Sequence, residues 1–142
     1  MSYATVDLLT GHLEGDGIAD SSKLLSQLAN VFADEACRAA MDQDTIVYEV
    51  QSQQLVKEGE PGGLFFGTSN VMPGKVGQEY FMTKGHYHAK RECAEYYWCI
   101  QGKGALILMD EAGNTTMEPM FPGSLHYIPG YVVHRLANTG DE

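Results

Sequence analysis

The sequence predicts a single all-β domain with one short helix, and three observations support this class. The chain has 142 residues, which suits one domain with a hydrophobic core of its own. Sixteen glycines and five prolines, most of them after Gly59, separate short apolar runs as turns separate strands. From Thr45 onward the apolar residues follow a period of two, which is typical of strands.

The predicted elements follow in order along the chain. The first thirty residues are weakly patterned and are expected to form an arm or edge strand. A helix of about ten residues is predicted around Ala33 to Asp42, capped by the Asp34 side chain. Strands are then predicted at 46–50, 64–71, 79–88, 94–100, 105–109, 115–117, 124–128 and 131–137. These short strands indicate a barrel or jelly roll, so we divide the domain 1–142 into an arm and helix (1–44) and a barrel (45–142).

The composition argues against two classes of partner. Nine Lys and Arg residues oppose nineteen Asp and Glu residues, and the resulting net charge of −10 repels nucleic acids and anionic lipid surfaces. The longest apolar run, Ala105 to Met109, is far shorter than the ~20 residues of a membrane span.

The N-terminal residues do not resemble a signal peptide, and three cysteines without a pairing pattern fit a reducing compartment. We therefore expect a cytoplasmic protein without a nucleic-acid or membrane partner.

Four residues form a candidate metal site: His86, His88, Glu95 and His134. Side chains at positions i and i+2 of a strand share a face, so His86 and His88 point the same way. Glu95 lies in the next strand, where Tyr97 and Cys99 share its face and Tyr96, Trp98 and Ile100 point to the other side. His134 lies far along the chain and joins the set only if the sheet closes. Three imidazoles and one carboxylate suit one divalent ion per chain, either Fe, Mn, Ni or Zn.

The spacing of these residues resembles the two signature motifs of the cupin superfamily. Gly102 follows Glu95 by seven residues. The second motif, G-x5-P-x4-H-x3-N, is matched by Gly123, Pro129, His134 and Asn138. The resemblance implies a jelly-roll barrel with a central metal.

Three departures from the cupin motifs point to one cupin family. Tyr80 stands where the first motif begins with glycine, Tyr131 stands where the second usually has one, and six residues separate His88 from Glu95. The run from Pro73 to Lys90, with Thr83-Lys84-Gly85-His86-Tyr87-His88-Ala89-Lys90 at its end, resembles the cupin-type glucose-6-phosphate isomerases. Further matches are Val47–Val50, Ala94–Tyr97, Gly102–Gly104 and Tyr127–Arg135, so the resemblance runs from about residue 31 to the C-terminus.

The resemblance implies interconversion of glucose 6-phosphate and fructose 6-phosphate, with a small-molecule sugar phosphate as the partner. It assigns the metal to His86, His88, Glu95 and His134, the substrate phosphate to Thr83 and the Gly85 backbone, and the sugar pocket to Tyr48 and Tyr97. Ser69 stands where the family has a threonine and keeps a hydroxyl for the substrate, and Lys84 adds a positive charge near the phosphate. Glu95 is our candidate base, because a carboxylate beside the reacting carbons can carry a proton between C1 and C2. His126 and His12 are expected to be structural or solvated.

Other interpretations stay open at this stage. The family continues past the turn at Gly140 with a strand and a segment that adds a histidine and tyrosines to the pocket, whereas this sequence stops at Glu142. We expect either a fragment or a shortened relative, with a barrel edge that a second copy covers in a homodimer. The alternative functions are a non-catalytic module that binds metal and sugar phosphate, and another cupin enzyme such as an iron-dependent dioxygenase.

Overall fold

The computed structural model describes residues 3–86, 88 and 90–142. It consists mainly of strands with one short α-helix, which confirms the all-β class. The elements are β1 (Ala4–Val6), β2 (Leu13–Gly15), β3 (Ile18–Leu24), the 3-10 helix η1 (Leu25–Gln27), α1 (Glu35–Ala40), β4 (Ile46–Gln54), β5 (Phe65–Val71), β6 (Lys75–Val76), β7 (Glu79–Tyr80), β8 (Glu95–Trp98), β9 (Gly104–Met109), β10 (Thr115–Met120), β11 (Leu125–Ile128) and β12 (Val133–Asn138). Neither helix in the described part of the chain has the length and apolar character needed to cross a membrane.

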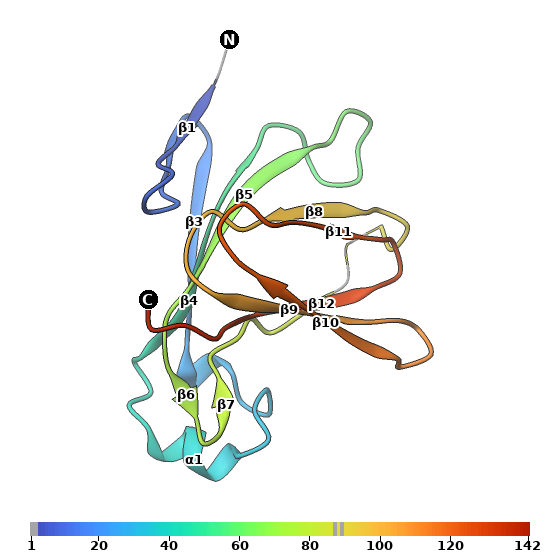
Figure 1. The fold of residues 1–142 in the computed structure, drawn as a ribbon. Coiled ribbons are helices and arrows are strands. Elements are labelled where there is room, and N and C mark those ends of the chain that lie inside the picture. Colours follow the sequence, from blue (N-terminus) through green and yellow to red (C-terminus); the bar gives the residue numbers. More distant parts are fainter. Residues whose placement is uncertain (1–2, 87, 89) are drawn as a thin grey trace.

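The strands form three main groups that surround the centre of the molecule (Figure 1). The longest strands make the antiparallel sheet β3-β4-β5, and two hairpins, β1-β2 and β6-β7, lie at its two ends. The ribbon β8-β11 and the sheet β10-β9-β12 form the other two groups. All pairings are antiparallel, as expected for strands joined by short turns.

The hydrogen bonds between the described strands do not close a continuous barrel. The predicted strand over 79–88 accounts for part of this difference, since regular pairing there is limited to β7. Gly85 has a φ of +78°, a left-handed conformation that interrupts a strand. Beyond β7, the described residues of this segment form no regular ladder with β12, and the two are joined by the isolated bridges Met82–Ala137 and His86–His134 and by side-chain hydrogen bonds. Tyr87 and Ala89 of the motif lie outside the described residues.

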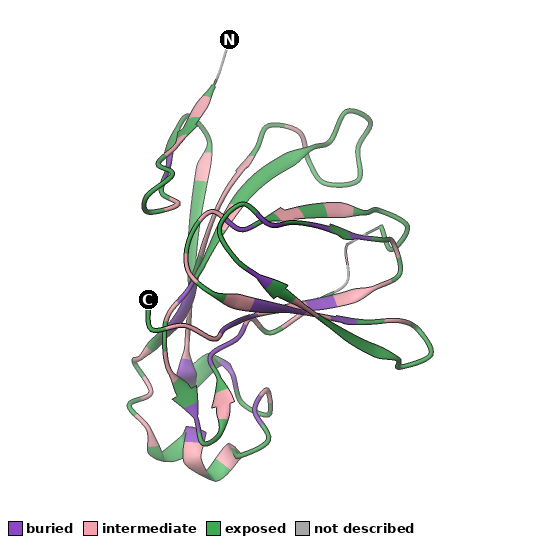
Figure 2. Cartoon of the chain, viewed as in Figure 1, coloured by how far each residue is buried: buried purple, intermediate pink, exposed green. Residues whose placement is uncertain are grey.

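Two apolar clusters fix the groups of strands. One packs η1, β4 and the β6-β7 hairpin together, with Leu25, Leu28, Val47 and Val76 fully buried at its centre. The other holds the β8-β11 ribbon against β9 and β10, and consists of Cys99, Leu106, Leu108, Met120 and Ile128. Figure 2 shows burial concentrated along β9 and β12, whereas β5 and β10 are largely exposed. Each cluster therefore anchors a strand that carries residues of the candidate site.

The predicted helix is present as α1, and its cap is the one expected. The Asp34 carboxylate accepts a hydrogen bond of 2.9 Å from the backbone N–H of Cys37. Arg38 is buried and donates to the Leu25 carbonyl at 2.7 Å, while its guanidinium also pairs with Glu35. These contacts tie α1 to η1, and they make up for the short length of the helix.

Candidate metal centre

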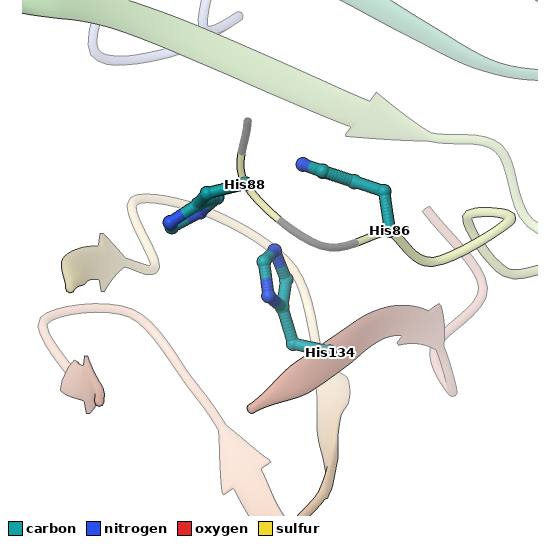
Figure 3. Close-up of side chains that lie close together, drawn as sticks. All are labelled: His86, His88 and His134. Atoms are coloured by element: carbon teal, nitrogen blue, oxygen red, sulfur yellow. The ribbon is translucent and has the colours of Figure 1, made fainter. Parts of the chain in front are cut away.

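Three histidines from two separate parts of the chain meet at one end of β12 (Figure 3). His86 and His88 come from the irregular segment after β7, and His134 is the second residue of β12. One ring nitrogen from each lies within 4.8 Å of the other two. His134 is only 2% exposed, His88 is half-buried and His86 is exposed. The structure therefore brings together the three imidazoles that the spacing predicted.

The fourth predicted ligand, Glu95, lies against two of the three rings. Its Oε1 atom is 2.8 Å from His88 Nε2 and 2.9 Å from His134 Nε2. Burial would raise the pKa of this carboxyl, but hydrogen bonds and charge interactions with His134 and His88 outweigh it and lower the pKa below its usual value. Glu95 is therefore ionised at neutral pH, as both a metal ligand and a general base must be.

The hydrogen bonds of His88 indicate a missing positive charge. Its Nδ1 atom is 2.9 Å from the Cys93 carbonyl oxygen, which can only accept, so Nδ1 carries a proton. Its Nε2 atom faces the Glu95 carboxylate, which also only accepts. A neutral imidazole has a single proton, so either a second proton or a metal ion must balance this contact. Burial lowers the pKa of His88, but the hydrogen bonds that its ring donates to Glu95 and to the Cys93 carbonyl outweigh this and raise the pKa.

His134 contacts the same oxygen of Glu95, but its other ring nitrogen has no partner among the described residues. Its Nε2 atom faces the same carboxylate oxygen and lies 3.2 Å from the Tyr97 hydroxyl. Its Nδ1 atom is buried and has no hydrogen-bond partner among the described residues. Two imidazole nitrogens thus converge on one carboxylate oxygen. Together with His86, whose pKa is lowered by burial and by the neighbouring His134, they form a donor set that suits a borderline divalent metal.

The predicted phosphate residues lie along the edge of β12 and on β5. The Thr83 backbone N–H donates to the Leu136 carbonyl at 2.9 Å, and its Oγ1 accepts from the Leu136 N–H at 3.0 Å. The Thr83 hydroxyl proton therefore stays available to a ligand. A Cβ atom on Gly85 would lie 2.7 Å from Arg135 Cγ, so only glycine fits beside that side chain. Lys84 is exposed.

The two tyrosines predicted for the sugar pocket are buried or half-buried near this segment. Tyr48 is 8% exposed, and its hydroxyl accepts a hydrogen bond of 3.4 Å from the Lys84 backbone N–H. Tyr97 is half-buried, and burial together with the nearby Glu95 charge raises its pKa. Ser69 is exposed and pairs with Val50 in the register that pairs Tyr48 with Val71, so Ser69 and Tyr48 share one face of the sheet.

Sequence reasoning missed two contacts of this site. Arg135 lies against Gly85, and its position directly after His134 in the chain was a signal that could have found it. The Cys93 carbonyl, which fixes the proton on His88, comes from a loop whose path no side-chain pattern indicates. A separate cavity of about 550 Å³ lies over β3, β4 and β5 and is lined by Thr10, Gly11, His12, Asp20, Ser21, Ser22, Glu49, Val50, Gln51, Thr68 and Asn70. It shares no residue with the metal centre.

Fold and site together define a small all-β protein with a candidate divalent-metal centre, and comparison with known proteins gives the family. The family model described as glucose-6-phosphate isomerase (GPI) matches residues 22–142. The chain belongs to this family, as the resemblance indicated.

Curated relatives agree with this assignment. The chain is 45% identical to the glucose-6-phosphate isomerase of Thermococcus onnurineus (strain NA1) and 42% identical to that of Pyrococcus horikoshii (strain ATCC 700860 / DSM 12428 / JCM 9974 / NBRC 100139 / OT-3). Each alignment covers 96% of this chain and 71% of the relative. It is 36% identical to the putative glucose-6-phosphate isomerase 1 of Rhizobium meliloti (strain 1021), over 96% of this chain and 64% of that protein.

Among solved structures, Peruvianin-I, titled a cysteine peptidase from Thevetia peruviana latex, aligns with 87% of this chain and 55% of its own. The TM-score is 0.43 and the identity 10%, which is too low to bear on fold or function.

Proposed function

We propose that this protein is a metal-dependent isomerase that interconverts glucose 6-phosphate and fructose 6-phosphate. Its family and the names of its relatives support this activity. The observation that carries the proposal is the convergence of three imidazole nitrogens within 4.8 Å, two of which face one ionised carboxylate oxygen. This is the donor set of a metal centre with positions left for a substrate.

His86, His88, Glu95 and His134 would hold one divalent ion per chain, either Fe, Mn, Ni or Zn. Such an ion, when bound, polarises a carbonyl oxygen and stabilises the negative charge that develops on it. The Cys93 carbonyl is not a ligand, but it accepts a hydrogen bond from Nδ1 of His88. This bond holds the ring proton on Nδ1 and leaves Nε2 free to coordinate the metal. These observations support the ligand roles, and they do not select among the four metals.

We assign the proton transfer between C1 and C2 to the Glu95 carboxylate. Its lowered pKa keeps it ionised, so an oxygen can take a proton from one carbon and return it to the next. Oε1 contacts two imidazoles, which hold the carboxylate in place during the transfer.

We place the substrate phosphate on the Thr83–Gly85 segment. Thr83 has a hydroxyl proton to donate, Gly85 allows close approach of the backbone, and Lys84 adds a positive charge. Ser69 would add a second hydroxyl from the face of β5 that it shares with Tyr48. Tyr48 and Tyr97 would line the sugar pocket, since their hydroxyls contact Lys84 and His134. Hydroxyl and backbone N–H donors suit a phosphate dianion even in an acidic protein.

A coupled assay of fructose 6-phosphate conversion tests the activity. We expect turnover by protein loaded with Fe, Mn, Ni or Zn, loss of turnover with EDTA, and recovery when the metal is restored. No turnover with any of the four metals would refute the isomerase proposal. Consumption of oxygen with a substrate would instead favour a dioxygenase.

The single domain 1–142 and the cytoplasmic location stay predictions from the sequence. We further propose that the protein forms a homodimer. An exposed apolar face on the β8-β11 ribbon supports the dimer, because such patches favour association. It is formed by two cross-strand pairs, Tyr96 with Tyr127 and Trp98 with Leu125, each residue 55–66% exposed. Sedimentation equilibrium that finds only monomer would overturn the dimer.

A further inference from the structure

A second histidine cluster lies outside the metal centre and consists of Glu118, Ser124 and His126. The His126 Nδ1 atom is 2.5 Å from Glu118 Oε2, and its Nε2 atom is 2.9 Å from Ser124 Oγ. His126 and Ser124 are buried, at 7% and 9% exposure, while the Glu118 side chain is 44% exposed. Both imidazole nitrogens are therefore satisfied, and one neutral ring with its proton on Nδ1 fits all the contacts.

The cluster joins two strands that no backbone ladder joins in the described structure. Glu118 is on β10 and His126 is on β11, and these strands belong to different sheets (Figure 1). The same two sheets are also joined by the apolar cluster around Leu106 and Ile128 and by the contact between Glu95 and His134. The Glu118–His126 hydrogen bond is therefore a polar link between the two sheets, with a buried imidazole at one end and a partly exposed carboxylate at the other.

The two linked sheets are also those that carry the metal ligands Glu95 and His134. Glu95 is on β8 and pairs with Ile128, which is two residues from His126 on the same face of β11. His134 is on β12 and pairs with Leu108 of β9, whereas Glu118 pairs with Leu106 of the same strand, two residues away. On each sheet, the cross-strand pair that carries the link is therefore two residues along the strands from the pair that carries Glu95 or His134.

Ser124, His126 and Glu118 are arranged in the order of a serine–histidine–carboxylate catalytic triad. Their contacts nevertheless favour a structural link between the two sheets over a catalytic role. Ser124 Oγ already accepts a hydrogen bond of 3.1 Å from the Phe121 backbone N–H. The neighbouring N–H groups of Gly123 and Ser124 are bonded to the Cys99 and Phe121 carbonyls, so they are not available to stabilise an oxyanion.

We propose that the Glu118–His126–Ser124 cluster is a positioning clasp, which sets the separation of the β8-β11 ribbon from the β9-β12 pair and so places Glu95 against His134. The inference rests on the proposed metal centre. His126 acts as the positioning residue, since it alone contacts both the carboxylate on β10 and the turn before β11. Groups that orient metal ligands from outside typically change metal affinity by about 10–100-fold.

His126→Leu tests the clasp, with Co²⁺ as the probe in titrations of the full chain. We expect at least a tenfold weaker Kd and a changed visible spectrum of the bound ion. Glu118→Gln should keep the wild-type Kd, because the amide oxygen of the new side chain can still accept from Nδ1–H. Met120→Ala is the matched control: it opens a cavity in the adjacent apolar cluster and lowers the Tm, but it leaves the clasp intact. We expect its Kd to stay within twofold of wild type.

A wild-type Kd and spectrum in His126→Leu would overturn the clasp, as would a Met120→Ala variant that weakens binding equally. If His126→Leu does not fold, Glu118→Ala replaces it, because that side chain is half-exposed. The ¹⁵N imidazole resonances of His88 and His134 in metal-free protein give a second readout. They should shift in His126→Leu and Glu118→Ala but not in Glu118→Gln or Met120→Ala, and unchanged resonances in the first two would refute the clasp. Wild-type protein that binds no Co²⁺ would count against the proposed metal centre, and the resonances would still decide the clasp.

Discussion

The molecule contains two clusters of histidine and glutamate, and they differ in how completely their hydrogen bonds are satisfied. In the clasp, each nitrogen of His126 has one partner, so the contacts are complete with a single proton on the ring. In the metal centre, two imidazole nitrogens face the same oxygen of Glu95, and the Nδ1 atom of His134 is buried without a partner among the described residues. Buried polar groups are normally paired, so the incomplete cluster is the one that could hold a metal ion.

Glu95→Ala should have the largest effect, because it removes the group that both His88 and His134 contact. We expect turnover to fall by about 10²–10⁴-fold or more, the range of general acid–base catalysis, with weaker metal binding as well. The coupled assay and a metal titration measure the two effects separately. Glu92→Ala is a matched control, since Glu92 is an exposed glutamate three residues away, and its kinetics should equal wild type. Unchanged kinetics in Glu95→Ala would refute the base assignment.

Metal removal should destabilise the wild-type protein, because we expect the ion to bind the histidine cluster of the native state. Variants of that cluster should lose this effect. A ligand present at a hundred times its Kd stabilises the native state by about 2.7 kcal/mol, which is a shift of several degrees in Tm. Differential scanning calorimetry with Mn²⁺ and with EDTA should show this shift in wild type and lose it in His88→Ala. His12→Ala should keep it, because His12 is exposed on the N-terminal arm. An equal shift in His88→Ala would mean that the ion binds elsewhere.

Thr83→Val tests whether the Thr83 hydroxyl binds the substrate phosphate. The variant loses the Oγ1 that accepts from the Leu136 N–H, which costs about 1 kcal/mol, and it loses the hydroxyl proposed for the phosphate. We expect a higher KM for fructose 6-phosphate and a lower free energy of unfolding, whereas Thr83→Ser should keep both near wild type. An unchanged KM in Thr83→Val would show that the phosphate does not bind at this hydroxyl.

The sequence predicted which histidines lie together better than it predicted the strand pairing around them, for a physical reason. The period of two placed Glu95 and Tyr97 on one face of β8, and their half-burial between the exposed Tyr96 and Trp98 confirms it. The spacing also predicted that His134 joins the other histidines, although isolated bridges and no regular ladder pair the described residues of the two segments. Motif spacing reports on such local geometry, which a few residues determine.

The clasp and the interrupted strand could not be predicted in this way. His126 was expected to be structural or solvated, and its partner Glu118 belongs to a different sheet, so their contact depends on how two sheets pack. Gly85 has a left-handed conformation, and the Arg135 side chain fills the space where a Cβ atom would lie. Both contacts are tertiary, and neither leaves a periodic pattern in the chain.

Of these substitutions, Tyr131→Gly should have the smallest effect on stability. It tests whether metal binding depends on the strained backbone conformation of residue 131. Tyr131 has a φ of +63° at the position where the cupin motif usually has glycine, in the turn that leads into His134. A left-handed non-glycine residue costs about 1–2 kcal/mol, and the added chain entropy of glycine offsets part of the gain. We expect a net stabilisation of about 0.5–1 kcal/mol in chemical denaturation, with an unchanged Kd for Co²⁺. Tyr131→Ala is the matched control, because it removes the ring but keeps the strain. If the Kd changed in Tyr131→Gly but not in Tyr131→Ala, the strained turn itself would be positioning His134, and the clasp would share that role with it.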